Sequence, residues 1–456
     1  MESIKAIGLD IGTTTICGMV LDAVTGEVLK KITRQNDALI VSENQWEKLQ
    51  AVSVVTMIVK DIVEELCHEY KKIACIGVTG QMHGIVYIND MGEAVSPLFS
   101  WQDGRGDLEY KEGLSYAGYL SKLTGYSLAT GFGAVTHFYN DLNRLVPKTA
   151  KQFCTIMDYI VMQLTHTVNP LVHSSNAASI GIFDMESGCF DKKAIELAAM
   201  DCSFFPQTTR QAEVIKGHKA AIPVAVAIGD NQASFMGSVK DNTDCLLVNI
   251  GTSSQISMFT EHFSKASLSL LRPLTAEEFI LVGSPLCGGR AYALLEGFFR
   301  AVSGLAGDGP AKPFYDIMAD LAQDFLTLEN PLVVATQFSG TRSQPDLRGS
   351  ISNMGTDNFT PKHFTIGVLQ GMVNELKELY ETMASLLTHK PQMLIGSGNG
   401  IRMNKPLQQM IATSFNMPLH IPVCEEEAAY GSSLFSLFAM GFFETLKEAQ
   451  DLIKYK

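Results

Sequence analysis

The sequence predicts an α/β protein built from two related domains that face a common cleft. Its 456 residues exceed what one hydrophobic core usually holds, about 250–300 residues. Residues 9–15 read LDIGTTT and residues 248–254 read VNIGTSS, and each copy lies between two apolar segments. A repeat at this spacing indicates two domains that each open with the same strand–turn–strand unit. We therefore expect an N-terminal domain at 1–237 and a C-terminal domain at 238–456.

Composition and charge argue against several classes of protein. The formal net charge is −13 and no run of Lys and Arg interrupts the acidic background, so nucleic acid and anionic membranes are poor candidates as partners. Nine cysteines without a C-x-x-C pair argue against a disulfide framework or a structural zinc site. The first residues do not resemble a signal peptide, and no apolar run is long enough to span a bilayer. We expect a cytoplasmic protein, and the sequence leaves a homodimer open.

The first copy of the repeat has the residues of a phosphate-binding turn. An apolar strand containing Asp10 is followed by a turn at Gly12 and by a second apolar segment at 16–21. Glycine lets the backbone approach a ligand closely, successive N–H groups can surround an anion, and Thr13 and Thr14 add hydroxyl donors. A carboxylate at Asp10 would repel phosphate unless a cation lay between them, so it predicts a Mg²⁺ site. The alternative is an ordinary hairpin turn.

The second copy repeats the turn without the acid. Gly251 and Thr252 match Gly12 and Thr13, whereas Asn249 stands where the first copy has an aspartate. Two matched copies favour phosphate binding over two unrelated turns, and only one of them needs an acid on the metal side. The sequence contains no G-x-x-x-x-G-K-[ST] motif, which argues against a P-loop kinase.

Other strand ends carry polar clusters of the kind that α/β proteins place at a cleft. The expected strand at 73–79 ends in GQMHG, and the one at 224–228 ends in GDNQA. In the second half, a strand at 393–395 is followed by GSGNG, where Gly398 is suited to a turn. We expect all three segments to face the cleft.

Helices are expected between these strands. Apolar residues recur at near-helical spacing across 45–70, and residues 290–302 form another helix. Thr360-Pro361 is a helix start, with Thr as the cap and Pro at the first position. Two more helices begin near 405 and 425. No low-complexity linker separates the halves, so they should pack closely around the cleft.

The order of these motifs resembles that of the FGGY carbohydrate kinases. DIGTT, GQMHG, WQDGR, GDNQA, NIGTSS and GSGNG follow one another over almost the whole chain, and their combined order is more specific than any one of them. The resemblance implies two ribonuclease-H-like domains of the actin-like ATPase type, with ATP bound between them. It also implies transfer of a phosphoryl group from ATP to a small-molecule sugar, with Mg²⁺ as the cofactor.

The resemblance also implies a role for each motif. Asp230 is the general base, and Asp10 lies on the magnesium side. The remaining residues divide among the phosphates (Gly12, Thr13, Thr14, Gly251, Thr252), the adenosine (Gly398, Asn399) and the sugar (Gln81, Met82, His83, Trp101, Asp103, Asn231 and Asp230 itself).

The chemistry of phosphoryl transfer suits these assignments, since it needs positioning and charge neutralisation more than covalent chemistry. A carboxylate at Asp230 can accept the proton of the attacking hydroxyl. Structural alternatives stand beside the functional ones. Asp230 can be a helix cap, His83 and Trp101 can be core side chains, and Asp103 can form an ion pair with Arg105.

Within the family, three segments favour sedoheptulokinase over xylulokinase. These are SWQDGR at 100–105, LATGFG at 128–133 and HSSNAAS at 173–179. Xylulokinases usually carry W-N-D at the first, and glycerol kinases have Arg-Glu in place of Met82-His83. The expected reaction is phosphorylation of sedoheptulose to sedoheptulose 7-phosphate. A xylulose or other pentulose or polyol kinase and a non-catalytic sugar sensor are the alternatives, with a cytoskeletal or chaperone-like ATPase ranked last.

Overall fold

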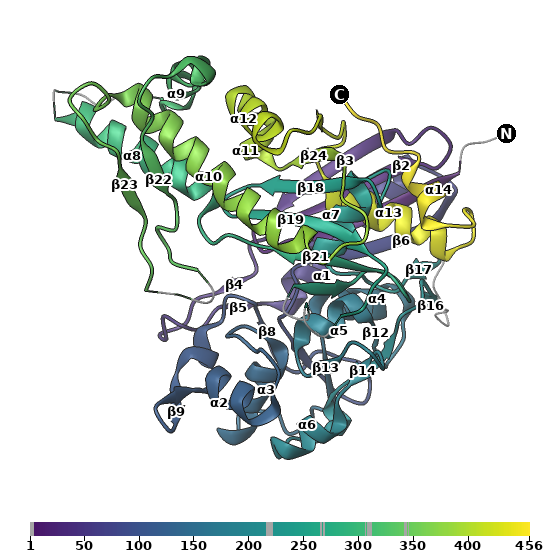
Figure 1. Cartoon of the computed structure of the whole chain (residues 1–456). Coiled ribbons are helices and arrows are strands. Elements are labelled where there is room, and N and C mark those ends of the chain that lie inside the picture. Colours follow the sequence, from purple (N-terminus) through teal and green to yellow (C-terminus); the bar gives the residue numbers. More distant parts are fainter. Residues whose placement is uncertain are drawn as a thin grey trace.

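A computed structural model of the chain describes residues 4–215, 222–264, 267, 270–305, 307, 312–341, 344 and 346–456. Its framework is a pair of six-stranded sheets that share the same arrangement of five strands, with the sixth strand added at opposite edges (Figure 1). The first sheet has the order β16-β17-β6-β1-β2-β3 and the second β20-β21-β19-β18-β24-β25. Their strands are β16 (Val214–Ile215), β17 (Val224–Ala225), β6 (Ile73–Gly80), β1 (Lys5–Ile11), β2 (Thr15–Asp22) and β3 (Val28–Gln35), and β20 (Leu271–Pro273), β21 (Phe279–Gly283), β19 (Ser254–Thr260), β18 (Cys245–Ile250), β24 (Met393–Ser397) and β25 (Leu419–His420).

The repeated motif occupies the same place in both sheets. β1 pairs antiparallel with β2 and parallel with β6, and β18 pairs antiparallel with β19 and parallel with β24. A third antiparallel strand extends each hairpin, and a second parallel strand lies on the other side. The expected pair of related α/β units is confirmed. The expected boundary at 237/238 falls in the last turn of α7 (Asp230–Ser238) and stays a prediction.

Apolar helix faces cover the sheets. α1 (Val52–Glu69) buries Val55, Ile62 and Leu66 against the first sheet, and α10 (Pro361–Ala384) buries Leu369 and Leu376 against the second. α8 (Gly288–Gly304) packs beside α10. α10 begins as expected, because the Thr360 side chain accepts a hydrogen bond from the N–H of His363.

The remaining elements surround this framework, and the segment from β8 (Leu98–Phe99) to α6 (Lys192–Leu197) forms most of the lower part of the molecule in Figure 1. The helices expected near 290, 405 and 425 are confirmed, whereas the helix expected from Gln45 is wrong before Val52, because β5 pairs there with β8. The smaller elements are β4 (Leu39–Ile40), β5 (Leu49–Gln50), β7 (Val86–Ile88), β8 (Leu98–Phe99), β9 (Glu109–Lys111), β10 (Leu114–Ser115), α2 (Tyr116–Thr124), α3 (Gly133–Leu142), β11 (Gln152–Cys154), α4 (Ile156–Thr165), β12 (Leu171–His173), α5 (Ser174–Ile180), β13 (Phe183–Asp184), β14 (Cys189–Phe190), α6 (Lys192–Leu197), β15 (Gln207–Thr209), α9 (Tyr315–Leu321), β22 (Val333–Ala335), β23 (Ser350–Ser352), α11 (Asn399–Arg402), α12 (Lys405–Phe415), α13 (Glu427–Ala439) and α14 (Leu446–Gln450), with 3₁₀ turns η1 (Gly104–Asp107), η2 (Cys202–Phe204) and η4 (Phe325–Thr327).

α13 returns from the C-terminal half to the first sheet, where Figure 1 shows it in yellow beside the purple strands. Two sheet glycines let it approach: a Cβ at Gly8 would lie 1.9 Å from the carbonyl oxygen of Ala429, and one at Gly77 would lie 1.8 Å from that of Ser432. α13 also crosses α7 closely, since a Cβ at Gly431 would lie 1.8 Å from the carbonyl oxygen of Ala233. The helix therefore joins the first sheet to α7.

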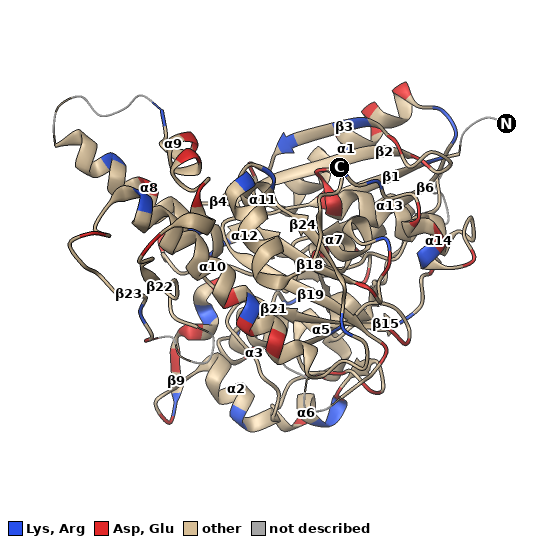
Figure 2. Ribbon diagram, turned by 45° about the horizontal axis from the view of Figure 1, so that its top comes forward, with Lys and Arg blue, Asp and Glu red and all other residues tan. Residues whose placement is uncertain are grey.

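Charged residues of both signs are spread over the surface. Figure 2 shows Lys and Arg scattered among Asp and Glu on the elements in view. Within the described part of the chain, no helix combines the length and the apolar character needed to cross a membrane.

A pair of helix glycines gives a test of this packing. Gly431→Ala should destabilise the protein by about 1–3 kcal/mol or more, because a methyl group cannot be accommodated against the α7 backbone. Gly297→Ala on α8 should instead stabilise it by about 0.5–1 kcal/mol, because that position is exposed, nothing described lies within 4 Å of its Cβ, and alanine is the better helix former. Thermal unfolding of both variants measures the difference. Equal shifts would show that the α7–α13 contact is looser than described.

Candidate active site

The first glycine turn connects β1 to β2 and is held from outside the hairpin. The Asn36 side chain donates to the carbonyl oxygen of Gly12 at 2.8 Å, and the Asn36 N–H donates to that of Thr14 at 2.8 Å. The Gln50 side chain donates to the carbonyl oxygen of Thr13 at 3.0 Å. Because the protein itself holds all three carbonyl groups, the turn keeps its shape without a ligand.

The second turn connects β18 to β19 and is closed by two helix starts. The N–H of Gly251 donates to the carbonyl oxygen of Ser253, and the N–H of Arg290 on α8 donates to that of Thr252, both at 2.9 Å. Gly398, which precedes α11 with a φ of 81°, approaches the same hairpin, since a Cβ there would lie 2.5 Å from the carbonyl oxygen of Ile250. The structure thus brings the Gly251 turn and the Gly398 segment together.

Two carboxylates belong to one electrostatic environment at the end of the first sheet. Asp10 is next to last in β1, and Asp230 is the first residue of α7. Burial, together with the negative charges of Asp230 and Glu426, raises the pKa of Asp10 to about 7. Burial also raises the pKa of Asp230 to about 6, opposed by hydrogen bonds from Asn231, whose side-chain amide lies 3.2 Å from the carboxylate. The two acids therefore lie close enough to influence each other.

Asp230 does not cap α7. The cap position is Gly229, and no side chain caps the helix there. Asp230 lies one residue further on, in the first turn, where the positive end of the helix favours a carboxylate. The structure therefore contradicts the alternative in which Asp230 serves as the cap.

The acids fit a metal ion that takes most of its ligands from outside the protein. In the described ranges, no group of three or more His, Cys, Asp and Glu side chains forms a metal cage, and no Lys, Arg or His lies within ion-pair distance of Asp10 or Asp230. Mg²⁺ is usually bound by one or two carboxylates together with water and substrate phosphates. Two acids without a cationic partner suit such a site, and Asp10 is the residue that could hold the ion.

Side chains expected on the sugar side converge on the first turn. The Trp101 indole N–H donates to the Thr13 hydroxyl at 2.9 Å, and that hydroxyl lies 3.4 Å from Oε1 of Gln81. The Gln81 amide donates to Gln50 at 2.9 Å. Trp101 is 45% exposed, so it is not a core residue. Residues from the two expected subsites, sugar and phosphate, thus share one hydrogen-bond network.

His83 is held in an unusual backbone conformation beside this network. Its φ is 74°, which is rare for a residue with a side chain. The N–H of His83 donates to the Ser179 hydroxyl at 3.2 Å, and Nδ1 lies 2.8 Å from the Ser179 carbonyl oxygen, so Nδ1 carries the proton. The ring stacks on Phe132 at 4.6 Å between centroids. Met82 precedes it, with its sulfur 3.8 Å from the amide nitrogen of Asn231.

Asp103 occupies a different environment from the one expected. It is 0% exposed, and its oxygens accept hydrogen bonds from Nε of Arg105 at 2.6 Å and from the N–H of Lys48 at 3.1 Å. The guanidinium of Arg105 also bonds to Asn140 and lies 4.4 Å from the centre of the Phe99 ring. The structure therefore favours the alternative in which Asp103 forms a buried ion pair that shapes the loop, and its contact with a sugar stays a prediction.

Three residues of the site carried no motif in the sequence. Asn36, directly after β3, and Gln50 of β5 brace the first turn, and Glu426 adds negative potential at Asp10. Asn36 and Gln50 are isolated polar residues in segments that read as strand ends. Only their buried positions, 7% and 3% exposed, distinguish them from ordinary surface residues.

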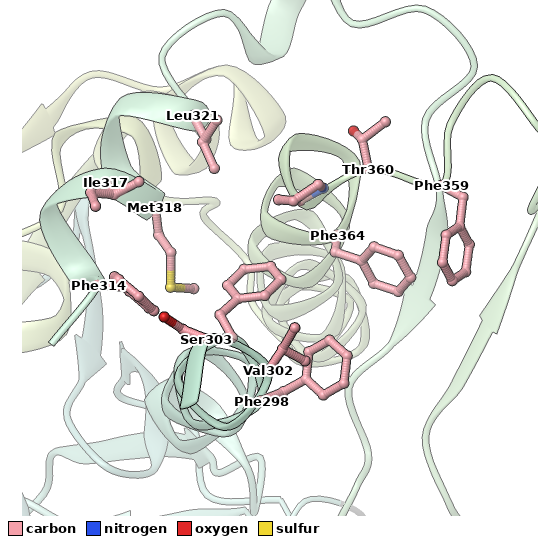
Figure 3. Close-up of a pocket in the computed structure, with 12 residues that line it drawn as sticks. Phe298, Val302, Ser303, Phe314, Ile317, Met318, Leu321, Phe359, Thr360 and Phe364 are labelled. Atoms are coloured by element: carbon pink, nitrogen blue, oxygen red, sulfur yellow. The ribbon is translucent and has the colours of Figure 1, made fainter. Parts of the chain in front are cut away.

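A separate apolar hollow lies in the C-terminal half, among α8, α9 and the start of α10 (Figure 3). Its volume is about 400 Å³. A sugar site needs several polar groups that point into it, and this hollow has almost none. We therefore do not assign the sugar to it. The side chains that line it include Phe298, Phe299, Val302, Phe314, Ile317, Met318 and Phe364.

Comparison with known families decides the class of protein. Residues 5–244 match the family model of the N-terminal domain of the FGGY family of carbohydrate kinases, and residues 246–440 match that of its C-terminal domain. The chain belongs to the FGGY family of carbohydrate kinases. It is therefore a phosphotransferase with an alcohol group as acceptor, as its motifs predicted.

Individual FGGY kinases are similar over nearly the full length. The sedoheptulokinases of Mus musculus and Homo sapiens are each 25% identical, over 94% of this chain and 97% of theirs. The structure of a ligand-bound xylulose kinase from Lactobacillus acidophilus matches with a TM-score of 0.81 at 18% identity, over 99% of this chain and 92% of that one. Plasmodium falciparum glycerol kinase with ADP matches with a TM-score of 0.80 at 18% identity, with the same coverage. These likenesses confirm the two-domain, ribonuclease-H-like fold of actin-like ATPases.

The raised pKa of Asp10 leads to a prediction about stability. A carboxyl whose pKa is higher in the folded than in the unfolded chain destabilises the fold increasingly as pH rises from about 4 to 7, and fully above that range. Asp10→Asn should therefore raise the midpoint of thermal unfolding by a few degrees at pH 8, at about 1 °C per kcal/mol for a chain of this length, and by less at pH 5.5. Asn249 already occupies the matching position of the second hairpin, so the backbone accepts the change.

Asp201→Asn is the matched control for that prediction. Hydrogen bonds from Ser203 lower the pKa of Asp201, so its ionised form stabilises the fold. This variant should show no gain at pH 8. A gain for Asp10→Asn that does not depend on pH would contradict the electrostatic explanation.

Proposed function

We propose that this FGGY kinase transfers the terminal phosphoryl group of ATP to a hydroxyl group of a ketose. The observation that carries the proposal is the placement of Asp10 and Asp230 in one electrostatic site, beside a braced glycine turn and without a cationic partner in the described residues. Sedoheptulose, phosphorylated to sedoheptulose 7-phosphate, is the favoured substrate, because the chain resembles the mouse and human sedoheptulokinases along nearly their whole length.

The two glycine turns are the proposed phosphate sites. Gly12, Thr13 and Thr14 in the first turn and Thr252 in the second would offer backbone N–H groups and hydroxyls to an anion. Gly251, whose own N–H is bonded to Ser253, would contribute open space for the anion to approach. The adenosine would contact Gly398 and Asn399, which adjoin the second turn. A glycerol kinase of the same fold contains ADP, which supports an adenine nucleotide as the donor. Asp10 would hold Mg²⁺, which when bound neutralises charge on the phosphates.

Asp230 is the proposed general base. Its pKa of about 6 leaves it ionised at neutral pH, and a base with a pKa near the working pH transfers protons efficiently. The carboxylate would accept the proton of the attacking hydroxyl, while Asn231 orients both the carboxylate and neighbouring sugar hydroxyls. Gln81, Met82, His83 and Trp101 complete the proposed sugar site, whereas the structure favours the ion-pair role for Asp103.

The role of Asp230 can be tested directly. Asp230→Asn should lower kcat by about 10²–10⁴-fold, because the amide cannot accept the proton, while the dissociation constant of the sugar changes less than about tenfold. Steady-state kinetics and calorimetric titration with the sugar measure the two quantities. Asp184→Asn, on β13 in the first half of the chain, is the control and should retain turnover. Near-full turnover of Asp230→Asn would refute the assignment.

The identity of the sugar can be tested with a panel of ketoses. Sedoheptulose should give the highest kcat/KM in a coupled assay of ATP consumption, ahead of xylulose, ribulose and glycerol. The structure of a xylulose kinase has the same fold, so xylulose is the main competitor. Turnover with xylulose but not with sedoheptulose would overturn the substrate. Binding of a sugar without consumption of ATP for every member of the panel would favour the non-catalytic sensor.

A further inference from the structure

The segment that leads into Asp230 is irregular and is fastened by side chains from other elements. β17 ends at Ala225 and α7 begins at Asp230, so residues 226–229 belong to neither. The Thr79 hydroxyl donates to the carbonyl oxygen of Ile228 at 2.8 Å, and the Asn176 amide donates to that of Ala227 at 3.3 Å. These two bonds hold carbonyl groups, whereas a third bond holds the amide next to Asp230.

That third bond is made by Ser175. The N–H of Gly229 donates to the Ser175 hydroxyl oxygen at 3.0 Å. Gly229 is the cap residue of α7 and has no side chain with which to fix its own position. A Cβ there would lie 2.6 Å from Cε of Met82, so a larger residue would require the Met82 side chain to shift. The position of this amide, and of the carboxylate that follows it, therefore depends on Ser175.

His173 gives the Ser175 hydroxyl its direction. Nδ1 of His173 lies 2.9 Å from the Ser175 hydroxyl and accepts the N–H of Ser175 at 3.3 Å, so Nδ1 carries a lone pair. The hydroxyl must then donate its proton to Nδ1 and present a lone pair to Gly229. Burial lowers the pKa of His173 to about 4, which keeps the ring neutral at pH 7. The ring also packs edge-on against Phe435 of α13, with centroids 5.6 Å apart.

We propose that Ser175, oriented by His173, is a positioning residue for phosphoryl transfer. The chain of donors from the Gly229 N–H to the Ser175 hydroxyl and on to Nδ1 of His173 fixes the start of α7, and with it the direction of the Asp230 carboxylate. A displacement of about 1 Å in a catalytic group can reduce the rate about 100-fold. The inference rests on the proposed role of Asp230 as the general base.

Ser174 provides a matched control. It is the neighbour of Ser175, both serines are 1% exposed, and both lie in the first turn of α5. The Ser174 hydroxyl, however, has no hydrogen-bond partner among the described residues. Removing either hydroxyl changes the buried volume by the same amount, so a difference between the two variants reports the hydrogen bonds of Ser175 to Gly229 and His173.

The test compares kcat with KM in both variants. Ser175→Ala should lower kcat by about 10–100-fold and change KM for ATP and sugar by less than about threefold, whereas Ser174→Ala should retain both values. Ser175→Thr keeps the hydroxyl and should restore kcat to within a few fold of the unmodified enzyme. Ser175→Cys keeps the shape with a weak acceptor and should behave like Ser175→Ala, which secures the test if the alanine variant does not fold. Equal effects of Ser174→Ala and Ser175→Ala, or full kcat with Ser175→Cys, would overturn the proposal.

A double variant separates this inference from the assignment of the base. If Ser175 acts through Asp230, Ser175→Ala should have little further effect on the residual turnover of Asp230→Asn. Loss of turnover in Asp230→Asn with full kcat in Ser175→Ala would overturn the positioning role alone. Near-full turnover in Asp230→Asn would overturn the base itself. If the fold-loss of kcat in the double variant equals the product of the losses in the two single variants, Ser175 acts independently of Asp230. That result would also overturn the inference.

Discussion

The close approach of α13 to the first sheet and to α7 is the constraint on which the site depends. Gly8 and Gly77 admit the backbone of α13 to one face of the sheet, and Gly431 admits it to α7. Asp10 lies two residues after Gly8 on β1, and Asp230 is the first residue of α7. The two acids, far apart in the sequence, are thus carried by elements that both pack closely against α13 (Figure 1). A side chain at any of these glycines would meet backbone atoms at less than 2 Å and would force the packed elements to shift.

The site gathers the carboxylates of Asp10, Asp230 and Glu426, and the ionised form of Asp10 destabilises the fold. Burial and mutual repulsion raise the pKa of Asp10, and Glu426 at the start of α13 adds to the repulsion although it pairs with Lys31 at 3.2 Å. The next residue, Glu427, pairs with Arg402 of α11, which follows the Gly398 segment. The start of α13 therefore contacts the surroundings of both glycine turns. A cluster of acids that costs stability in the free protein is typical of a site that binds a cation or transfers protons.

Local chemistry explains which features the sequence could predict. The glycine turns, the polar strand ends and the Thr360-Pro361 helix start all follow from properties of neighbouring residues, and the structure contains each of them. Tertiary contacts explain the rest. Asp103 could be read as a sugar ligand or as an ion pair, and only its 0% exposure favours the ion pair. Trp46 and Leu49 fitted a helical pattern, but pairing of β5 with β8 overrides it. The return of α13 to the first sheet, like the bracing by Asn36 and Gln50, left no pattern in the residues nearby.

The difference between the two hairpins follows from their surroundings. Asn249 takes the place of Asp10, and its pairing with Ser397 places it at the start of the Gly398 turn, where a Cβ at Gly398 would lie 3.0 Å from its side-chain oxygen. An aspartate at 249 would add a charge beside this turn and beside the phosphates that the second hairpin is proposed to bind. Such a charge is costly unless a cation offsets it. At Asp10 the proposed Mg²⁺ supplies that cation, whereas one ion cannot serve both turns equally. The repeated unit therefore has the glycine in both copies, where it would let a phosphate approach the backbone, and has the acid in only one.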